Sequence, residues 1–393
     1  MYIALLGRQP AISIAELEQS YGSVSWFSDT AALVDTEQPI DVQRLGGTQK
    51  AGRVILTLPA RDWRTVSMKI VQHYSKAWAT YEGKITLGLS VYGLNVPPRD
   101  IQKTGLVLKS KLKETPASLR LIPNQDAALS SATSHHNKLG LSDNKIELLI
   151  VKGRSQIIVA ESVGAQNITA LAARDQGRPR RDAFVGMLPP KLAQIMINLA
   201  GPLEPDTEGL LPQPRILDPF CGTGVLLQEA MLMRYGAYGT DLAEKMIRFS
   251  RDNLNWLQDH AHMTGHWYLH EGDAMTTTWQ QPIAAVVTEA YLGQPFSAPP
   301  SSSKLTEVRG NCNHIISQFL KNLGTQIASG TPVVVAVPAW KAVDGTFTHL
   351  PLIGNLEKLG YQQLQLKTVN ADQLLYFRPD QVVAREILVL KKK

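Results

Sequence analysis

Acidic residues recur at the ends of apolar segments in the second half of this 393-residue chain. Asp218 ends the segment "RILD" and precedes a glycine-containing turn, and Glu289 ends the segment "AAVVTE". Asp241 and Asp273 occupy the corresponding places after the segments "AYGT" and "HWYLHEG". In open α/β sheets ligands bind beyond the carboxyl ends of the strands. The pattern therefore predicts one site that gathers these four acids at one edge of a sheet.

The turn after Asp218, "PFCGTG", adds a second feature of a ligand site. Gly222 and Gly224 allow the backbone to pass close to a ligand, and the helix that follows offers free N–H groups. The turn is neither a GxGxxG motif nor a P-loop, and acids at successive strand ends repel phosphate. They suit a neutral nucleoside or a cation, and S-adenosylmethionine is an adenosine that carries a sulfonium and no phosphate. Asp241 lies about twenty residues beyond the turn, where an acid binds ribose hydroxyls in nucleotide-binding sheets, and Asp273 is expected near the adenine amine. Taken singly, each acid is equally well explained as a helix N-cap.

Alternating strand and helix patterns from about residue 212 onwards must position this site. Such alternation is typical of right-handed βαβ crossovers and a doubly wound parallel sheet. The expected strands are 215–220, 237–242, 266–274, 284–290 and 331–340, followed by an antiparallel pair at 361–370 and 383–392. The expected helices are 191–200, 222–236, 243–261 and 304–329.

The first half of the chain has a different, α+β pattern. We expect strands at 2–7, 53–59, 84–93 and 118–123, a hairpin at 146–164, and helices at 13–22, 63–78 and 103–113. The segment "LSSATSHHNKLG" is expected to be a polar turn whose His135 and His136 face RNA or solvent rather than a metal. A linker rich in Arg, Gly and Pro marks a boundary. The predicted organisation is a domain of residues 1–60, a domain of 61–165, a linker of 166–190 and a domain of 191–393.

The charge of the chain indicates a polyanionic partner. Net charge is +6 and the isoelectric point is about 9.1, which suits a nucleic acid. Two basic runs stand out, "KTGLVLKSKLK" at 103–113 and "RDQGRPRRDAF" at 174–184. A solvated helix face and a charged linker explain each run taken alone, but two runs in a basic chain favour nucleic-acid binding.

Composition excludes several other classes of protein. There is no apolar run of about 18 residues, as a membrane span requires, and the N-terminus lacks the features of a signal peptide. The two cysteines, Cys221 and Cys312, are too few for a disulfide framework or a four-cysteine zinc site. We expect a cytoplasmic protein without a membrane partner or a metal site.

Several segments resemble one family. "ILDPFCGTGVLLQEA", "YGTDL" and "EGDA" look like a class I S-adenosylmethionine-dependent methyltransferase that modifies amino groups. The segment 174–200, the segment 129–140 and the N-terminal "YIALLGRQPAISIAEL" are similar to the THUMP-domain tRNA guanine-N2 methyltransferases, which act on guanosine 10 of tRNA in archaea and eukaryotes. The resemblance implies a ferredoxin-like domain over 1–60, a THUMP domain over 61–165 and a Rossmann-like methyltransferase domain over 191–393.

The same resemblance implies a cofactor and partners. The cofactor is S-adenosylmethionine and the main partner is tRNA; the need for a small activating subunit stays open, and without one we expect a monomer. The implied cofactor-binding residues are Asp218, Pro219, Phe220, Gly222, Gly224, Asp241, Leu242, Asp273 and Ala274. The predicted RNA-binding residues are Lys109, Lys111, Lys113, Arg178, Arg180 and Arg181.

The chain departs from the family at the fourth strand end. Family members usually carry Asp-Pro-Pro-Tyr there, whereas this sequence reads Glu289-Ala290-Tyr291-Leu292-Gly293. The amine of guanine is a weak nucleophile because its lone pair is delocalised, so an acceptor oxygen must orient it. We predict that Glu289 and a backbone carbonyl orient the amine and that Tyr291 stacks on the base. A guanosine N2 is the leading target; the alternatives are another RNA amine or a tRNA-binding protein without catalysis.

Overall fold

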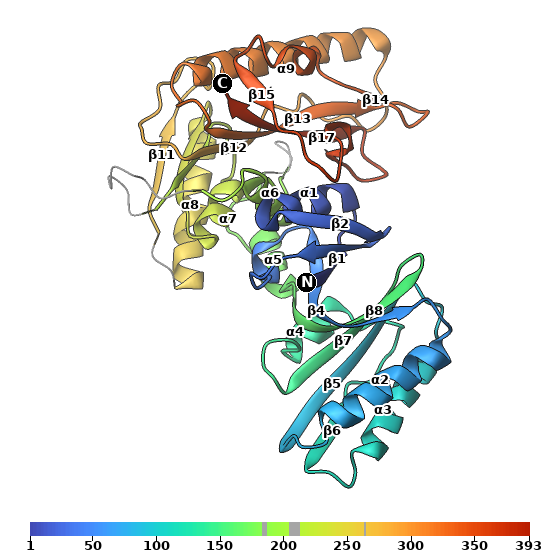
Figure 1. Ribbon diagram of the computed structural model, residues 1–393. Helices are drawn as coiled ribbons and strands as arrows, with labels where there is room; N and C mark the ends of the chain where they lie inside the picture. The colour runs from blue at the N-terminus through green and yellow to red at the C-terminus, as the bar shows by residue number, and fades with distance from the viewer. Residues whose placement is uncertain (183–186, 204–212, 263–264) are drawn as a thin grey trace. The chain divides into compact units, whose positions relative to one another are not determined.

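The computed structural model describes residues 1–182, 187–203, 213–262 and 265–393 (Figure 1). The chain divides into two compact units, Met1–Ala170 and Leu171–Lys393. Each unit is built around its own sheet, so the predicted mixed α/β class is confirmed. None of the helices in the described part of the chain is long and apolar enough to cross a membrane.

The first unit contains an eight-stranded sheet in the order β2-β3-β1-β4-β8-β7-β5-β6. Its strands are β1 (Tyr2–Leu6), β2 (Ser23–Ser28), β3 (Ala31–Asp35), β4 (Thr48–Pro59), β5 (Gly83–Tyr92), β6 (Ala117–Leu121), β7 (Lys145–Lys152) and β8 (Gln156–Ala165). The long strand β4 pairs with β1 along its first half and with β8 along nearly its whole length. The domain boundary predicted at residue 60 falls directly after β4, in a sheet that both predicted N-terminal domains share.

The helices of the first unit follow the sequence pattern closely. They are α1 (Pro10–Tyr21), α2 (Trp63–Ala77), α3 (Pro98–Lys111) and α4 (Ser131–His136), with α5 (Ile168–Gln176) at the junction of the two units. Helix α1 ends at Gly22, whose φ of 86° requires glycine, as the sequence predicted. Two predictions are corrected. The expected polar turn around His135 is helix α4, because Ser130 caps it by accepting a hydrogen bond from the Thr133 N–H. The expected linker contains α5.

The second unit contains a sheet in the order β11-β10-β9-β12-β13-β17-β15. Its strands are β9 (Arg215–Asp218), β10 (Gly236–Asp241), β11 (Trp267–Glu271), β12 (Ala285–Glu289), β13 (Pro332–Lys341), β15 (Tyr361–Gln363) and β17 (Val383–Lys392), with the short β14 (Phe347–Thr348) and β16 (Leu375–Tyr376) at its side. The first five strands are parallel, whereas β17 is antiparallel to both β13 and β15. The predicted doubly wound sheet and its antiparallel final pair are therefore confirmed.

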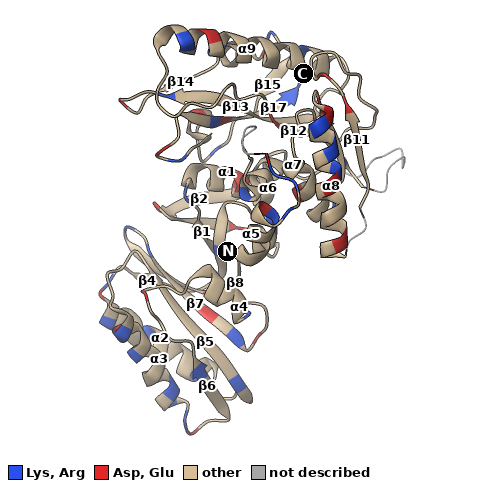
Figure 2. Cartoon of the chain, turned by 180° about the vertical axis from the view of Figure 1, so that it is seen from behind, with Lys and Arg blue, Asp and Glu red and all other residues tan. Residues whose placement is uncertain are grey.

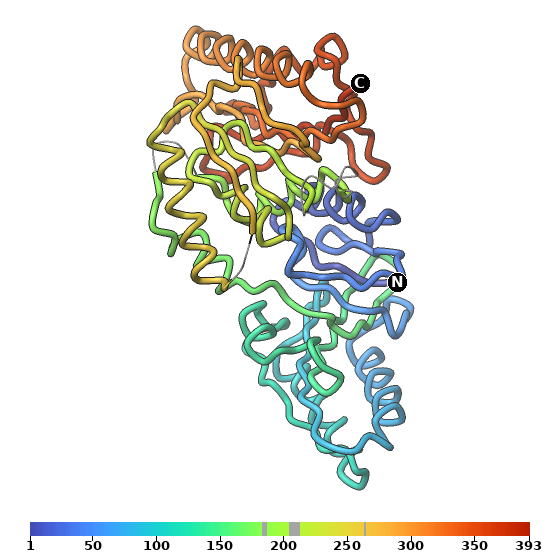
Figure 3. The backbone as a smooth tube through the Cα atoms, turned by 90° about the vertical axis from the view of Figure 1, so that its left-hand side faces the viewer, coloured from blue at the N-terminus to red at the C-terminus, as the bar shows by residue number. Residues whose placement is uncertain are grey.

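Helices cover both faces of this sheet (Figures 1 and 3). The helices are α6 (Pro190–Leu199), α7 (Val225–Leu232), α8 (Glu244–Ala261) and α9 (Ser302–Gly324). Helix α9 buries Cys312, Ile316 and Phe319 in one apolar cluster with alternate residues of β13, whereas α7 and α8 share a second cluster with β10 and β11. Side chains alternate between the two faces of a strand, so each strand contributes apolar residues to both helical layers. The ends of the strands lie outside these apolar layers and carry the polar groups.

Candidate functional site

The glycine turn after β9 forms one wall of the candidate site. Gly222 and Gly224 have φ values of 50° and 80°, in the left-handed region that favours glycine. A Cβ on Gly224 would lie 2.9 Å from Ser250 Oγ, whereas a Cβ on Gly222 would meet no atom within 4 Å. Gly224 therefore allows close packing against α8, and Gly222 faces open space.

The carboxyl ends of β9, β10 and β11 meet around Asp241, as predicted. Gly222 N donates a hydrogen bond to Asp241 Oδ2 at 2.9 Å, and Ala243 N donates to Oδ1 at 3.0 Å. The backbone of β10 reaches the next loop, because Gly272 N donates to Asp241 O at 2.9 Å. Asp273 follows directly and accepts a hydrogen bond from Met275 N at 2.9 Å. Burial raises the pKa of Asp241, although its two hydrogen bonds from backbone amides act in the opposite direction.

Asp218 is an internal part of the site rather than an exposed one. Its side chain is only 3% exposed, and Oδ1 accepts hydrogen bonds from Thr288 Oγ1 at 2.6 Å and from Phe220 N at 3.3 Å. Burial raises the pKa of Asp218 to about 7, and the nearby charges of Asp241 and Glu289 act in the same direction. Asp218 therefore joins the end of β9 to the end of β12.

The remaining predicted cofactor residues differ in exposure. Pro219 and Ala274 are buried, and Phe220 is half-buried with its ring 5.2 Å from that of Phe319. Leu242 is 69% exposed, directly after Asp241.

Glu289 is the last residue of β12, and Tyr291 lies two residues beyond the strand. Tyr291 is 41% exposed, which leaves its ring available for stacking. The Glu289 side chain is only 14% exposed and forms an ion pair with Arg385 of β17, whose side chain is 9% exposed. Sequence reasoning missed both Arg385 and the Thr288 bond to Asp218. The only signal for Arg385 is a charged pair, Arg385-Glu386, inside an apolar strand.

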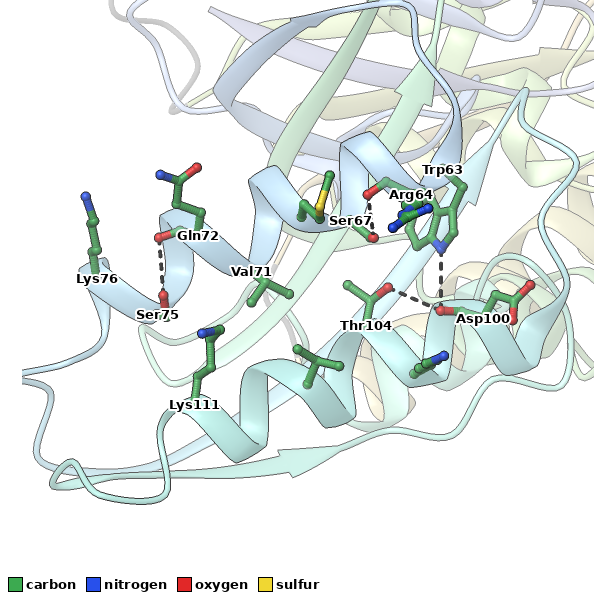
Figure 4. A pocket seen from close by; sticks show the side chains of 13 residues that line it. Trp63, Arg64, Ser67, Val71, Gln72, Ser75, Lys76, Asp100, Thr104 and Lys111 are labelled. Carbon is green, nitrogen blue, oxygen red and sulfur yellow. Dashed lines mark hydrogen bonds between the residues drawn. The ribbon is translucent and has the colours of Figure 1, made fainter.

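The predicted RNA-binding lysines lie on and just after α3. Lys109, Lys111 and Lys113 are all exposed, and cations gather on α2 and α3 (Figure 2). A groove of about 710 Å³ runs between these two helices, and Lys111 lines it, whereas Lys109 and Lys113 do not (Figure 4). The lining of the groove includes three apolar residues, four cations and one acid: Met68, Val71, Val107, Arg64, Lys76, Lys103, Lys111 and Asp100.

The predicted RNA-binding arginines are separated by the structure. Arg181 is exposed, and Arg180 Nε donates to Asp252 Oδ2 at 2.6 Å. Arg178 is only 3% exposed, and none of its three guanidinium nitrogens has a hydrogen-bond partner in the described ranges of the chain. Burial lowers the pKa of Arg178. The three residues thus differ in their access to a large ligand.

Solved structures support the architecture. The crystal structure of TrmN from Thermus thermophilus matches with a TM-score of 0.51 and 13% identity, over 100% of this chain and 99% of that one. At this level of identity the match shows the fold.

Two curated relatives share sequence with part of the chain. The tRNA (guanine(10)-N2)-dimethyltransferase of Methanothermobacter thermautotrophicus is 30% identical over 166 residues, which cover 42% of this chain and 43% of that protein. The protein of the same name from Pyrococcus abyssi is 39% identical over 69 residues, 18% of each chain. The alignments thus span less than half the length of these relatives.

One family profile covers the strand ends described above. Residues 178–338 match the family described as "UPF0020: RMKL-like, methyltransferase domain", and this range contains Asp218, Gly222, Asp241, Asp273 and Glu289. Residues 178–338 are therefore similar to the methyltransferase domains of the UPF0020, RMKL-like family, a family of S-adenosylmethionine-dependent methyltransferases.

Proposed function

We propose that this protein transfers a methyl group from S-adenosylmethionine to the exocyclic N2 amine of a tRNA guanosine, with position 10 as the leading target. The observation that carries the proposal is the position of Glu289 and Tyr291. Glu289 ends β12 and Tyr291 lies two residues beyond it, and β12 pairs with β9, the strand that leads into the glycine turn. The two relatives named tRNA (guanine(10)-N2)-dimethyltransferase support the choice of nucleotide.

The residues around the glycine turn fit S-adenosylmethionine. The open space at Gly222 admits a ligand beside the backbone, and no cation in the described contacts pairs with Asp241. We assign the ribose hydroxyls to Asp241, one face of the adenine to Leu242, and the adenine amine to the loop at Asp273 and Ala274. When bound, the donor supplies an electrophilic methyl group attached to a sulfonium.

The protein's contribution to the reaction is orientation. A guanine amine becomes nucleophilic when its two hydrogens are held by acceptors and its lone pair points at the methyl group. We assign one acceptor to the Glu289 carboxylate and the other to a backbone carbonyl at the end of β12. Tyr291, exposed beyond the strand, stacks on the base after it leaves the RNA helix.

We assign part of the tRNA contact to the groove between α2 and α3. Lysine and arginine side chains contact phosphates, and apolar side chains accommodate bases or sugars. Lys111 and Lys103 line this groove, and Arg181 offers a separate exposed cation in the second unit. We further propose a ferredoxin-like domain over residues 1–60, a THUMP domain over 61–165 and a cytoplasmic location. A small activating subunit is a candidate additional partner.

A second candidate function has one observation in its favour. The Glu289 carboxylate is already paired with Arg385. This pairing competes with the binding of a target amine, which suits a chain that binds tRNA without catalysis. A methyltransferase for another RNA amine is a third outcome, because the altered motif at Glu289–Gly293 changes the geometry of the base site.

The test is an assay of the purified protein with bulk tRNA and labelled S-adenosylmethionine, followed by nucleoside analysis. We expect N2-methylguanosine or N2,N2-dimethylguanosine, mapped to position 10. A different methylated nucleoside would redirect the proposal to another amine. Absence of label from tRNA and ribosomal RNA, with intact tRNA binding, would support the second candidate.

A further inference from the structure

The ion pair between Glu289 and Arg385 crosses an intervening strand. Glu289 is paired in register with Ala336 of β13, and Arg385 is paired with Pro338 of the same strand. Residues paired across a ladder project to the same face, and so do residues two apart along one strand. Glu289 and Arg385 therefore share a face of the sheet, and the small side chains of Ala336 and Pro338 let the guanidinium reach diagonally to the carboxylate.

The ion pair engages only part of the carboxylate. Arg385 Nε donates to Glu289 Oε1. Within the described residues, Glu289 Oε2 accepts no hydrogen bond. It also keeps some contact with solvent, since it is not among the fully buried atoms that lack a partner. The side chain of Glu289 keeps 14% exposure at the strand end. One oxygen is thus held by Arg385, and the other is not fully buried.

Glutamate has one more rotatable bond than aspartate, so an unrestrained Glu289 loses more conformational freedom when it orients a substrate. A charge-assisted hydrogen bond from a planar guanidinium restricts the carboxylate before substrate arrives. Pre-organisation of this kind raises the rate because reacting groups need no rearrangement.

We propose that Arg385 is a positioning residue that holds Glu289 Oε1 and thereby presents Oε2 to the target amine. The inference rests on the proposed function, because it assumes that Glu289 orients an amine. Arg385 itself touches neither the amine nor the methyl group in this proposal. Its effect on catalysis passes entirely through Glu289.

The neighbouring residue on β17 provides a matched control. Glu386 is paired in register with Val337, so it projects to the opposite face from Arg385. It has its own hydrogen-bond partner, because Glu386 Oε2 lies 2.7 Å from His349 Nδ1. The Glu386→Gln substitution therefore weakens a buried interaction of the same strand without touching Glu289.

The experiment measures kcat, the KM values for tRNA and donor, and the melting temperature of full-length variants. We expect Arg385→Met to lower kcat on the order of 100-fold with both KM values nearly unchanged, and Arg385→Lys to restore part of the loss. Glu386→Gln should lower the melting temperature and leave kcat near that of the wild type. If Arg385→Met does not fold, Arg385→Gln and Arg385→Lys provide the same comparison.

A double mutant separates positioning from a general structural role. If Arg385 acts through Glu289, then Glu289→Ala/Arg385→Met should be no slower than Glu289→Ala alone. Equal slowing by Arg385→Met in both backgrounds, or no slowing in either, would overturn the inference while leaving the proposed function intact. A wild-type protein that methylates no RNA would overturn the proposed function, and this inference with it.

Discussion

Asp241 holds Gly222 by a hydrogen bond from the Gly222 amide to the Asp241 carboxylate, 2.9 Å long. The other carboxylate oxygen accepts from Ala243 N at the start of α8. One side chain therefore fixes the glycine turn and the following helix relative to each other, while its remaining lone pairs stay available to a ligand. The acid predicted from sequence to bind the donor also builds one wall of the proposed donor site.

Replacement of Asp241 tests the donor assignment. Asp241→Ala should weaken S-adenosylmethionine binding by about 1–3 kcal/mol, the cost of removing a hydrogen bond to a charged group, measured by calorimetry. Asp241→Asn should have a smaller effect because one oxygen acceptor remains. Asp259→Asn, at an exposed position of α8, is the matched control and should leave the affinity unchanged. Equal affinities for wild type and Asp241→Ala would remove this residue from the ribose site.

Substitutions at the fourth strand end test the orientation mechanism. Glu289→Gln keeps an oxygen acceptor and should retain some activity, whereas Glu289→Ala should retain far less, with donor affinity intact. Tyr291→Ala should lose stacking worth roughly 1–3 kcal/mol, and Tyr291→Phe should keep most of it. Methyl transfer to tRNA under single-turnover conditions is the measurement. An active Glu289→Ala enzyme would mean that the acceptor lies elsewhere.

The groove between α2 and α3 predicts that lysines on and just after α3 contribute unequally to tRNA affinity. Lys103→Ala/Lys111→Ala should weaken tRNA binding and flatten the dependence of log Kd on log salt by about one for each phosphate that the variant no longer neutralises. Lys109→Ala/Lys113→Ala removes the same charge outside the groove and should have the smaller effect. Lys358→Ala in the second unit controls for net charge. Identical slopes for all variants and wild type would mean that α3 is a solvated helix face.

Arg178 predicts a gain in stability rather than a loss of RNA binding. A buried cation without a hydrogen-bond partner in the described chain is costly. Arg178→Met keeps the length and removes the charge, so the melting temperature should rise. Arg181→Ala, at an exposed position, should leave stability unchanged and weaken tRNA binding instead. A lower melting temperature for Arg178→Met would show that its guanidinium has a stabilising partner.

The pKa of Asp218 predicts a pH dependence of stability. The folded protein keeps the proton up to about pH 7, whereas the unfolded chain releases it near the ordinary value of 3.8. The folded state therefore binds more protons between these values, and the free energy of unfolding falls as pH rises from about 4 to 7, by at most about 1.4 kcal/mol per pH unit. Asp218→Asn should remove this contribution. Urea unfolding at several pH values measures the slope, and equal slopes for both proteins would contradict the assignment.

Sequence reasoning located the features that depend on local order. Gly22, Gly222 and Gly224 were identifiable because left-handed backbone demands glycine at turns. Strands β12 and β13 were identifiable because buried parallel strands are nearly continuously apolar. Strand β2 was missed because its residues, "SVSWFS", show neither an apolar run nor a clean alternation.

Interactions between distant segments were beyond the reach of the sequence. Glu289 and Arg385 are 96 residues apart, and nothing in a single sequence states which strand lies beside β13. The burial of Arg178 was missed for a related reason, because an arginine-rich linker has the same composition whether its side chains face solvent or the interior.

The position of β17 has a consequence for protein synthesis. The glycine turn, Asp241 and Glu289 all leave the ribosome before the strand that carries Arg385, yet β13 has an unpaired edge until β17 is inserted beside it. A nascent chain can therefore form the donor-binding half of the sheet while the Glu289 carboxylate still lacks its cation. If Arg385 positions Glu289, as we propose, the catalytic arrangement is complete only after β17 has paired with β13.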